Sequence, residues 1–150
     1  MASSGGSSGW RPAPLGGGYS AARDELEILV ADDVPDVRQV IADTLRMEGH
    51  RVTTASNGDS AIRLLREQHF DLVFTDLNMP PGISGFALIA ALREVNAEVP
   101  IVVISGTFVD RVNNEIAQSG TVLGTLRKPF QLLDLLDFVE QVRLRKLGAD

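Results

Sequence analysis

The sequence predicts an α/β protein, a single doubly wound sheet of five parallel strands with helices on both faces. Short apolar runs alternate five times with amphipathic stretches, which is the pattern of consecutive β–α units. The apolar runs are nearly continuous, as expected for strands that are buried on both faces. The length of 150 residues fits one domain of this kind.

The predicted strands are short runs of apolar or β-branched residues. They are Glu27–Ala31, Arg51–Ala55, Leu72–Thr75, Ile101–Ser105 and Val122–Leu126. The predicted helices have apolar residues three and four positions apart. They are Pro35–Glu48, Gly58–Gln68, Gly85–Val95, Val109–Gln118 and Leu132–Leu147. The expected core positions include Val40 in the first helix and Leu132 in the last, and Gly49 is expected to cap the first helix.

The composition and charge exclude several kinds of site and partner. Residues 1–24 are rich in Gly, Ser, Ala and Pro and are expected to form a disordered extension or leader before a domain at 25–150. A net charge of −6 opposes binding to nucleic acid. The absence of cysteine excludes disulfides and zinc–thiolate sites. No apolar run approaches the roughly 18 residues of a membrane span, so we expect a cytoplasmic protein without a membrane segment.

Polar side chains follow four of the predicted strands. Asp32 and Asp33 come after the first strand, Asp76 after the third and Lys128 after the fifth, while Ser105 ends the fourth. In parallel sheets these positions meet at the carboxyl edge, where ligands bind. Three close carboxylates repel one another unless a cation is present, and Mg²⁺ prefers such oxygen ligands. A carboxylate held beside a metal and a lysine is a suitable nucleophile for phosphoryl transfer.

These motifs together resemble the response-regulator receiver family of two-component signalling. They are DD at 32–33, DLNMP at 76–80 with Gly85, ISGT at 104–107 and KPF at 128–130. The resemblance covers about residues 25–147, from a stand-alone receiver or from part of a hybrid histidine kinase. It implies a flavodoxin-like (βα)5 fold with strand order 2-1-3-4-5. It also implies that the protein is no enzyme beyond its own phosphorylation and dephosphorylation.

The resemblance also assigns roles to residues. Asp76 would be the phosphoacceptor, and Asp33, Asp76 and the backbone carbonyl of Asn78 would ligate Mg²⁺. Asp32 would act through water, Lys128 would pair with Asp76 and then with the phosphoryl group, and Ser105 would hydrogen-bond that group. The Lys128–Pro129 peptide is usually cis in this family. A histidine kinase or histidine phosphotransfer protein would donate the phosphoryl group, and output would be protein–protein contact by a monomer or weak dimer.

Two departures from the family pattern stand out. MPPG lengthens the loop after Asp76 by one residue, and Thr125 occupies the position of the usual switch Tyr or Phe. Thr125 keeps open a second reading, a pseudo-receiver that binds partners without being phosphorylated. A third reading is a haloacid-dehalogenase-like phosphatase, which would need D-x-D after the first strand, whereas this chain has the adjacent pair DD.

Overall fold

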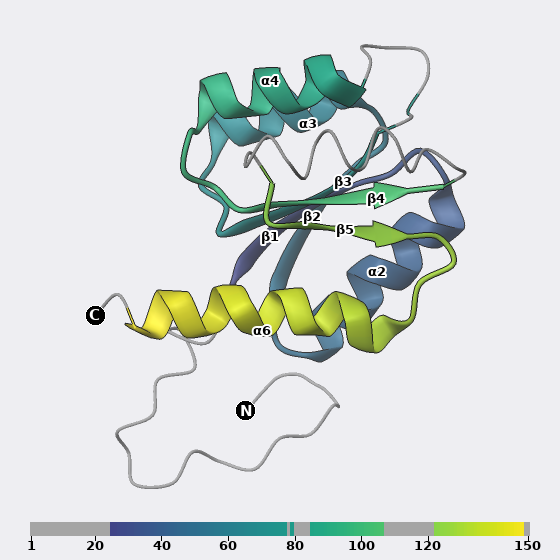
Figure 1. Cartoon of the computed structure of the whole chain (residues 1–150), viewed down its shortest axis with the longest axis vertical. Helices are drawn as coiled ribbons and strands as arrows, with labels where there is room; N and C mark the ends of the chain where they lie inside the picture. The colour runs from purple at the N-terminus through teal and green to yellow at the C-terminus, as the bar shows by residue number, and fades with distance from the viewer. Residues whose placement is uncertain (1–24, 78, 80–84, 107–121, 149–150) are drawn as a thin grey trace, which may run out of the picture.

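The computed structural model describes residues 25–77, 79, 85–106 and 122–148. Five strands alternate with helices along the chain, and Figure 1 shows the sheet between two layers of helices. The elements are β1 (Glu27–Ala31), α2 (Pro35–Met47), β2 (Arg51–Ala55), α3 (Gly58–Glu67), β3 (Leu72–Asp76), α4 (Gly85–Val95), β4 (Ile101–Ser105), β5 (Gly124–Arg127) and α6 (Leu132–Gly148). The predicted extension at 1–24 and the predicted helix Val109–Gln118 lie outside the described residues.

The sheet is parallel throughout, with the strand order β2-β1-β3-β4-β5. This confirms the predicted fold class and strand order. The order reverses between β1 and β3, because β1 pairs with β2 on one side and with β3 on the other. In open α/β sheets, ligands bind beyond the carboxyl ends of the strands at such a reversal.

Two apolar clusters hold the layers to the sheet. Helices α3 and α4 cover one face, and α2 and α6 cover the other (Figure 1). Strand side chains alternate between the two clusters, so that Leu29 and Val73 lie in the first while Val30 and Phe74 lie in the second. Both faces of the central strands are therefore buried, in agreement with their continuous apolar sequence.

Local sequence explains where the first two helices begin and end. Pro35 opens α2, where its missing N–H costs no helical hydrogen bond. Gly49 follows α2 with a φ of 96°, a conformation that favours glycine, as predicted for a helix end. Asn57 caps α3, because its side chain accepts a hydrogen bond of 2.8 Å from the Ser60 N–H.

Four predicted elements end one residue away from their predicted limits: α2 ends at Met47, α3 at Glu67, β3 at Asp76 and α6 at Gly148. Three other expectations were wrong by more. β5 spans Gly124–Arg127 instead of 122–126, because its pairing with β4 begins at Gly124 opposite Val102. Val40 and Leu132, expected in the core, are 51% and 42% exposed. The helical period identifies a face but does not say how far the neighbouring elements cover it.

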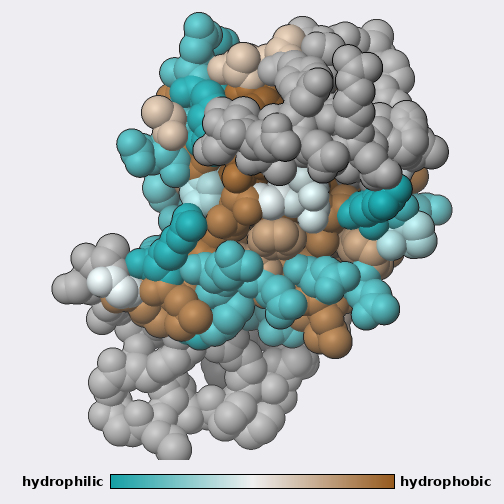
Figure 2. Space-filling model, in the orientation of Figure 1, coloured by the Kyte–Doolittle hydropathy of each residue, from teal (hydrophilic) through white to brown (hydrophobic). Residues whose placement is uncertain are grey.

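The face of α6 that is visible in Figure 2 is mostly hydrophilic, with separate apolar patches. Leu133 and Leu144 are among the exposed apolar residues of this helix. Within the described residues, no helix is both long and apolar enough to cross a membrane.

Candidate phosphoacceptor and metal site

Strand register brings three of the predicted site residues to the same end of one sheet face. Ala31 pairs with Thr75, so Asp32 and Asp76 lie at the same level on neighbouring strands. Val30, Phe74 and Leu126 all belong to the cluster under α2 and α6. Asp32, Asp76 and Lys128 each stand two residues further on and therefore continue those three rows of side chains toward the carboxyl edge.

Lys128 joins the two buried aspartates. Its Nζ donates a hydrogen bond of 3.0 Å to Asp76 Oδ2 and lies 3.0 Å from Asp32 Oδ2. Asp32 is fully buried and Asp76 is 4% exposed, whereas the Lys128 side chain is 21% exposed. The lysine therefore carries positive charge from the surface to two carboxylates that water scarcely reaches.

The third carboxylate completes an acidic cluster. Asp32, Asp33 and Asp76 each offer an oxygen, and these oxygens lie within 4.8 Å of one another. One lysine cannot neutralise three carboxylates at this distance, and uncompensated buried charge is costly. Oxygens that converge in this way are what a divalent cation such as Mg²⁺ requires.

A buried oxygen of Asp32 supports the same conclusion. Asp32 Oδ2 accepts no hydrogen bond within the described residues, although Lys128 forms an ion pair with it. Buried carboxylate oxygens normally accept hydrogen bonds from protein or water. A cation with its bound water would supply the missing donor, so the residues present fit a magnesium site.

Burial sets the acid–base behaviour of these groups. Burial raises the pKa of Asp32, and the neighbouring Asp76 carboxylate adds to the rise, while the hydrogen bond from Val34 and the contact with Lys128 oppose it. For Lys128, burial alone would lower the pKa, but Asp32 and Asp76 outweigh it and the pKa is raised. The two carboxylates therefore favour the charged form of Lys128, while burial disfavours the charged form of Asp32.

The backbone of Asp32 is held by a residue that sequence analysis missed. The Asp32 N–H donates to the Ala55 carbonyl at 3.1 Å, and Asp32 Oδ1 accepts from the Val34 N–H at 2.9 Å. Arg38, in the first turns of α2, donates from Nη1 to the Asp32 carbonyl at 2.8 Å. The only feature of the sequence that indicates this contact is the spacing, since Arg38 lies six residues after Asp32 and one helical turn after Val34.

The remaining predicted residues are described less completely. Asn78 and the side chain of Ser105 lie outside the described residues, although the Ser105 backbone ends β4 opposite Arg127. Thr125 is half-buried in β5 and pairs with Val103. The Lys128–Pro129 peptide is cis, as the resemblance implied.

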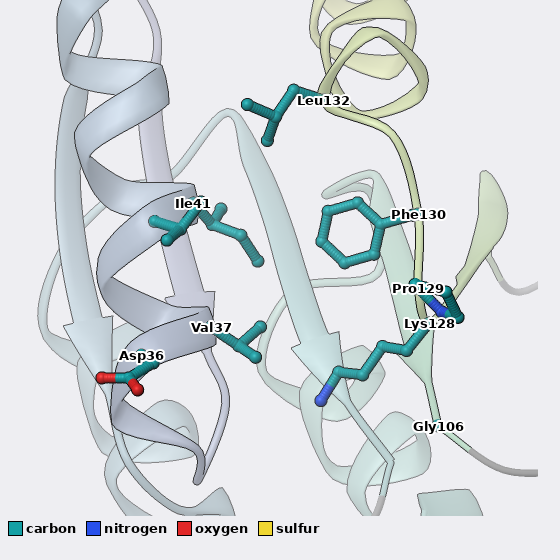
Figure 3. A pocket seen from close by; sticks show the side chains of 9 residues that line it. Asp36, Val37, Ile41, Gly106, Lys128, Pro129, Phe130 and Leu132 are labelled. Carbon is teal, nitrogen blue, oxygen red and sulfur yellow. The ribbon is translucent and has the colours of Figure 1, made fainter.

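A groove of about 730 Å³ opens beside Lys128. It runs between the start of α2 and the segment that joins β5 to α6, and Figure 3 shows Val37 and Ile41 facing Phe130 and Leu132 across it. Val40 also lines the groove, so the two helix residues that were wrongly expected in the core belong to the same surface.

Comparison with known proteins agrees with this architecture. The family model described as "Response regulator receiver domain" matches residues 28–140, more than half of the chain. The chain is 35% identical over 125 residues to the transcriptional regulatory protein PrrA of Mycobacterium leprae. This match covers 81% of this chain and 51% of PrrA. The chain is 31% identical over 109 residues to the sensor histidine kinase RcsC of Escherichia coli K12. That match covers 73% of this chain and 11% of RcsC.

The chain thus spans only part of these relatives. A Francisella response regulator receiver domain has a similar structure, with a TM-score of 0.72 and 28% identity, and the match covers 80% of this chain and 98% of that chain. The sheet order, the acidic cluster and the matched family model all point to the same group of proteins. The chain belongs to the response regulator receiver domain family of two-component systems.

Proposed function

We propose that Asp76 accepts a phosphoryl group from a phosphohistidine donor in a reaction that depends on Mg²⁺. The observation that carries this proposal is the position of Lys128, whose Nζ lies 3.0 Å from both Asp76 Oδ2 and Asp32 Oδ2. A carboxylate nucleophile needs nearby positive charge while the transferring phosphoryl group brings further negative charge.

In the proposed reaction an Asp76 carboxylate oxygen attacks phosphorus in line with the phosphorus–nitrogen bond of the donor. The new phosphorus–oxygen bond forms as the phosphorus–nitrogen bond breaks, and the imidazole, protonated on its other ring nitrogen, leaves as a neutral ring with the bonding electron pair. Lys128 stays protonated and stabilises the charge on the phosphoryl oxygens, and the Ser105 hydroxyl donates a hydrogen bond to one of them. The product is an aspartyl phosphate on this chain, so the protein is a phosphorylated switch and no conventional enzyme.

The acidic cluster would hold the cation. Asp33, Asp76 and the backbone carbonyl of Asn78 would bind Mg²⁺ directly, and Asp32 would bind it through water. When bound, Mg²⁺ supplies positive charge that neutralises the transferring phosphoryl group. The support for this assignment is the 4.8 Å spread of the carboxylate oxygens and the unsatisfied Asp32 Oδ2.

We further propose that the donor is a histidine kinase or a histidine phosphotransfer protein that contacts the groove between α2 and α6. Lys128 lines the groove and hydrogen-bonds Asp76, so a partner seated in it would bring its phosphohistidine close to Asp76. Its wall is mainly apolar, which suits contact with a protein surface. Output then takes place through protein–protein contact in the cytoplasm, by a monomer or weak dimer.

Intact-mass spectrometry after incubation with acetyl phosphate and Mg²⁺ tests this function. The wild type should gain one phosphoryl group, and Asp76→Asn should gain none. Asp43→Asn is the matched control, because Asp43 is an exposed aspartate of α2 outside the cluster, and it should react like the wild type. An unmodified wild type in this assay and with phosphohistidine donors would favour the pseudo-receiver reading.

A further inference from the structure

The peptide that joins Asp32 to Asp33 is held by a charged side chain. The carbonyl of this peptide is the Asp32 oxygen that accepts the 2.8 Å hydrogen bond from Arg38 Nη1. Charge-assisted hydrogen bonds of this kind are roughly twice as strong as neutral ones. Rotation of this peptide would move the Asp33 carboxylate relative to the Asp32 carboxylate.

The two acidic residues depend on this contact to different degrees. Asp32 has other anchors, since its N–H bonds to Ala55 and its Oδ1 accepts from Val34. Within the described residues, Asp33 forms no hydrogen bond or ion pair. Among the described residues, the position of the Asp33 carboxylate therefore depends on the backbone, and Arg38 holds the peptide that precedes it.

Arg38 makes no ion pair within the part of the chain that the structure describes. Its guanidinium nevertheless contacts the backbone of Asp32, a member of the acidic cluster. An arginine beside acidic residues ordinarily pairs with a carboxylate, often through two hydrogen bonds. Here the contact is made to the backbone, and the bond from Arg38 Nη1 goes to the Asp32 carbonyl instead of a carboxylate oxygen.

We propose that Arg38 is a positioning residue for the metal site, which holds the Asp32–Asp33 peptide so that the Asp33 carboxylate converges with Asp76. This inference rests on the proposed function, because it requires that the acidic cluster bind Mg²⁺. Arg38 itself touches neither the metal nor the phosphoryl group in this proposal.

The sign of the effect on Mg²⁺ affinity separates positioning from simple charge. Arg38 is a cation near the acidic cluster, so through its charge alone it would repel Mg²⁺, and its removal would tighten binding. If Arg38 acts by positioning, its removal instead weakens binding, because the acidic turn must then be ordered when the metal binds. Loss of a partner that orients metal ligands typically weakens affinity about 10–100-fold.

Isothermal titration calorimetry with Mg²⁺ alone makes the test. We expect Arg38→Ala to weaken Mg²⁺ binding about tenfold, with part of the affinity recovered in Arg38→Lys. Arg46→Ala is the matched control, because Arg46 lies on the same helix and also donates to a backbone carbonyl, that of Val52, at 3.0 Å. It removes the same charge and a similar hydrogen bond but should change the affinity less than about twofold, since Val52 lies away from the cluster.

Phosphorylation by acetyl phosphate gives a second readout. At saturating Mg²⁺, Arg38→Ala should be phosphorylated at close to the wild-type rate, because the bound metal orders the acidic turn. Unchanged or tighter Mg²⁺ binding in Arg38→Ala would overturn the inference while leaving the proposed function intact. A wild type that binds no Mg²⁺ would overturn both, and a rate that stays low at saturating Mg²⁺ would show that Arg38 acts on the phosphoryl group instead.

Discussion

A buried aspartate and a half-buried one lie at opposite edges of the same sheet and have opposite surroundings. Asp32 follows β1 at the carboxyl edge, and Asp71 precedes β3 at the amino edge. Asp71 Oδ2 accepts a hydrogen bond from the Glu27 N–H at 2.8 Å and lies 3.3 Å from Lys146 Nζ, while Oδ1 lies 3.0 Å from His69 Nε2. Asp32, by contrast, keeps one oxygen without a hydrogen bond among the described residues.

The pKa values of the two aspartates shift in opposite directions. Burial alone would raise the pKa of Asp71, but the Glu27 N–H, His69 and Lys146 outweigh it and the pKa is lowered. Burial does raise the pKa of Asp32, because the hydrogen bond from Val34 and the contact with Lys128 do not outweigh it and Asp76 adds repulsion. A carboxylate stabilises the fold where its contacts outweigh the cost of burial, and the one whose contacts do not can gain from a ligand.

The largest expected effect is a loss of stability when Asp71 is removed from the amino edge. Asp71→Ala should lower the free energy of unfolding by about 2 kcal/mol, because it leaves the Glu27 N–H and the partly exposed Lys146 without their acceptor. Chemical unfolding in urea measures this loss. Asp43→Ala, which removes an exposed aspartate, should change the free energy by less than about 0.5 kcal/mol. Equal losses in the two variants would mean that the Asp71 contacts contribute nothing.

The next effect concerns the two neighbouring acids at the carboxyl edge. Asp33→Ala should weaken Mg²⁺ binding by at least about tenfold, because Asp33 is expected to bind the metal directly. Asp32→Ala should weaken it less, since Asp32 is expected to act through water. Mg²⁺ titrations by calorimetry compare the two variants. Equal losses would contradict the assignment of one direct and one water-mediated ligand.

Most of the fold could be predicted from sequence, because strand burial and helix period leave a direct pattern in it. The apolar run at Ile101–Ser105 and the helix Gly85–Val95 have the predicted bounds. The limits of β5 could not be predicted, because they are set by where β4 offers pairing partners. Val40 and Leu132 were misplaced because the groove that exposes them forms only when two distant segments meet.

The candidate site was predictable to a similar degree. Asp32, Asp33, Asp76 and Lys128 were found because the carboxyl ends of parallel strands share one edge, and the structure brings them together. Arg38 was missed because its partner is a backbone carbonyl, which every residue possesses and which leaves no pattern in the sequence. Asp71 was missed for a related reason, since one of its partners is the Glu27 N–H.

Removing the repulsion at the carboxyl edge should change the free energy of unfolding less than removing Asp71 at the amino edge. Asp32→Asn keeps an acceptor for the Val34 N–H but removes a charge that repels Asp76. Without metal it should raise the free energy of unfolding by no more than about 1 kcal/mol. Saturating Mg²⁺ should reverse the order of stability, because the wild type binds the metal more tightly. Urea unfolding with and without Mg²⁺ measures both, and a destabilised Asp32→Asn without metal would contradict the account of Asp32.

The smallest expected effect is a difference in the pH dependence of stability. The lowered pKa of Asp71 means that, in mildly acidic solution, the unfolded state takes up a proton at this residue before the folded state does. Asp71 therefore contributes stability above the ordinary aspartate range, and this contribution is lost as the pH falls through its folded pKa. The raised pKa of Asp32 has the opposite sign, because the folded state takes up the proton first. Its cost at neutral pH is relieved as the pH falls through that raised pKa toward the ordinary range. Urea unfolding without Mg²⁺ from neutral to acidic pH should therefore show a shallower acid loss in Asp71→Asn than in the wild type and a steeper one in Asp32→Asn. Parallel profiles for all three proteins would mean that the two edges of the sheet do not differ as their contacts indicate.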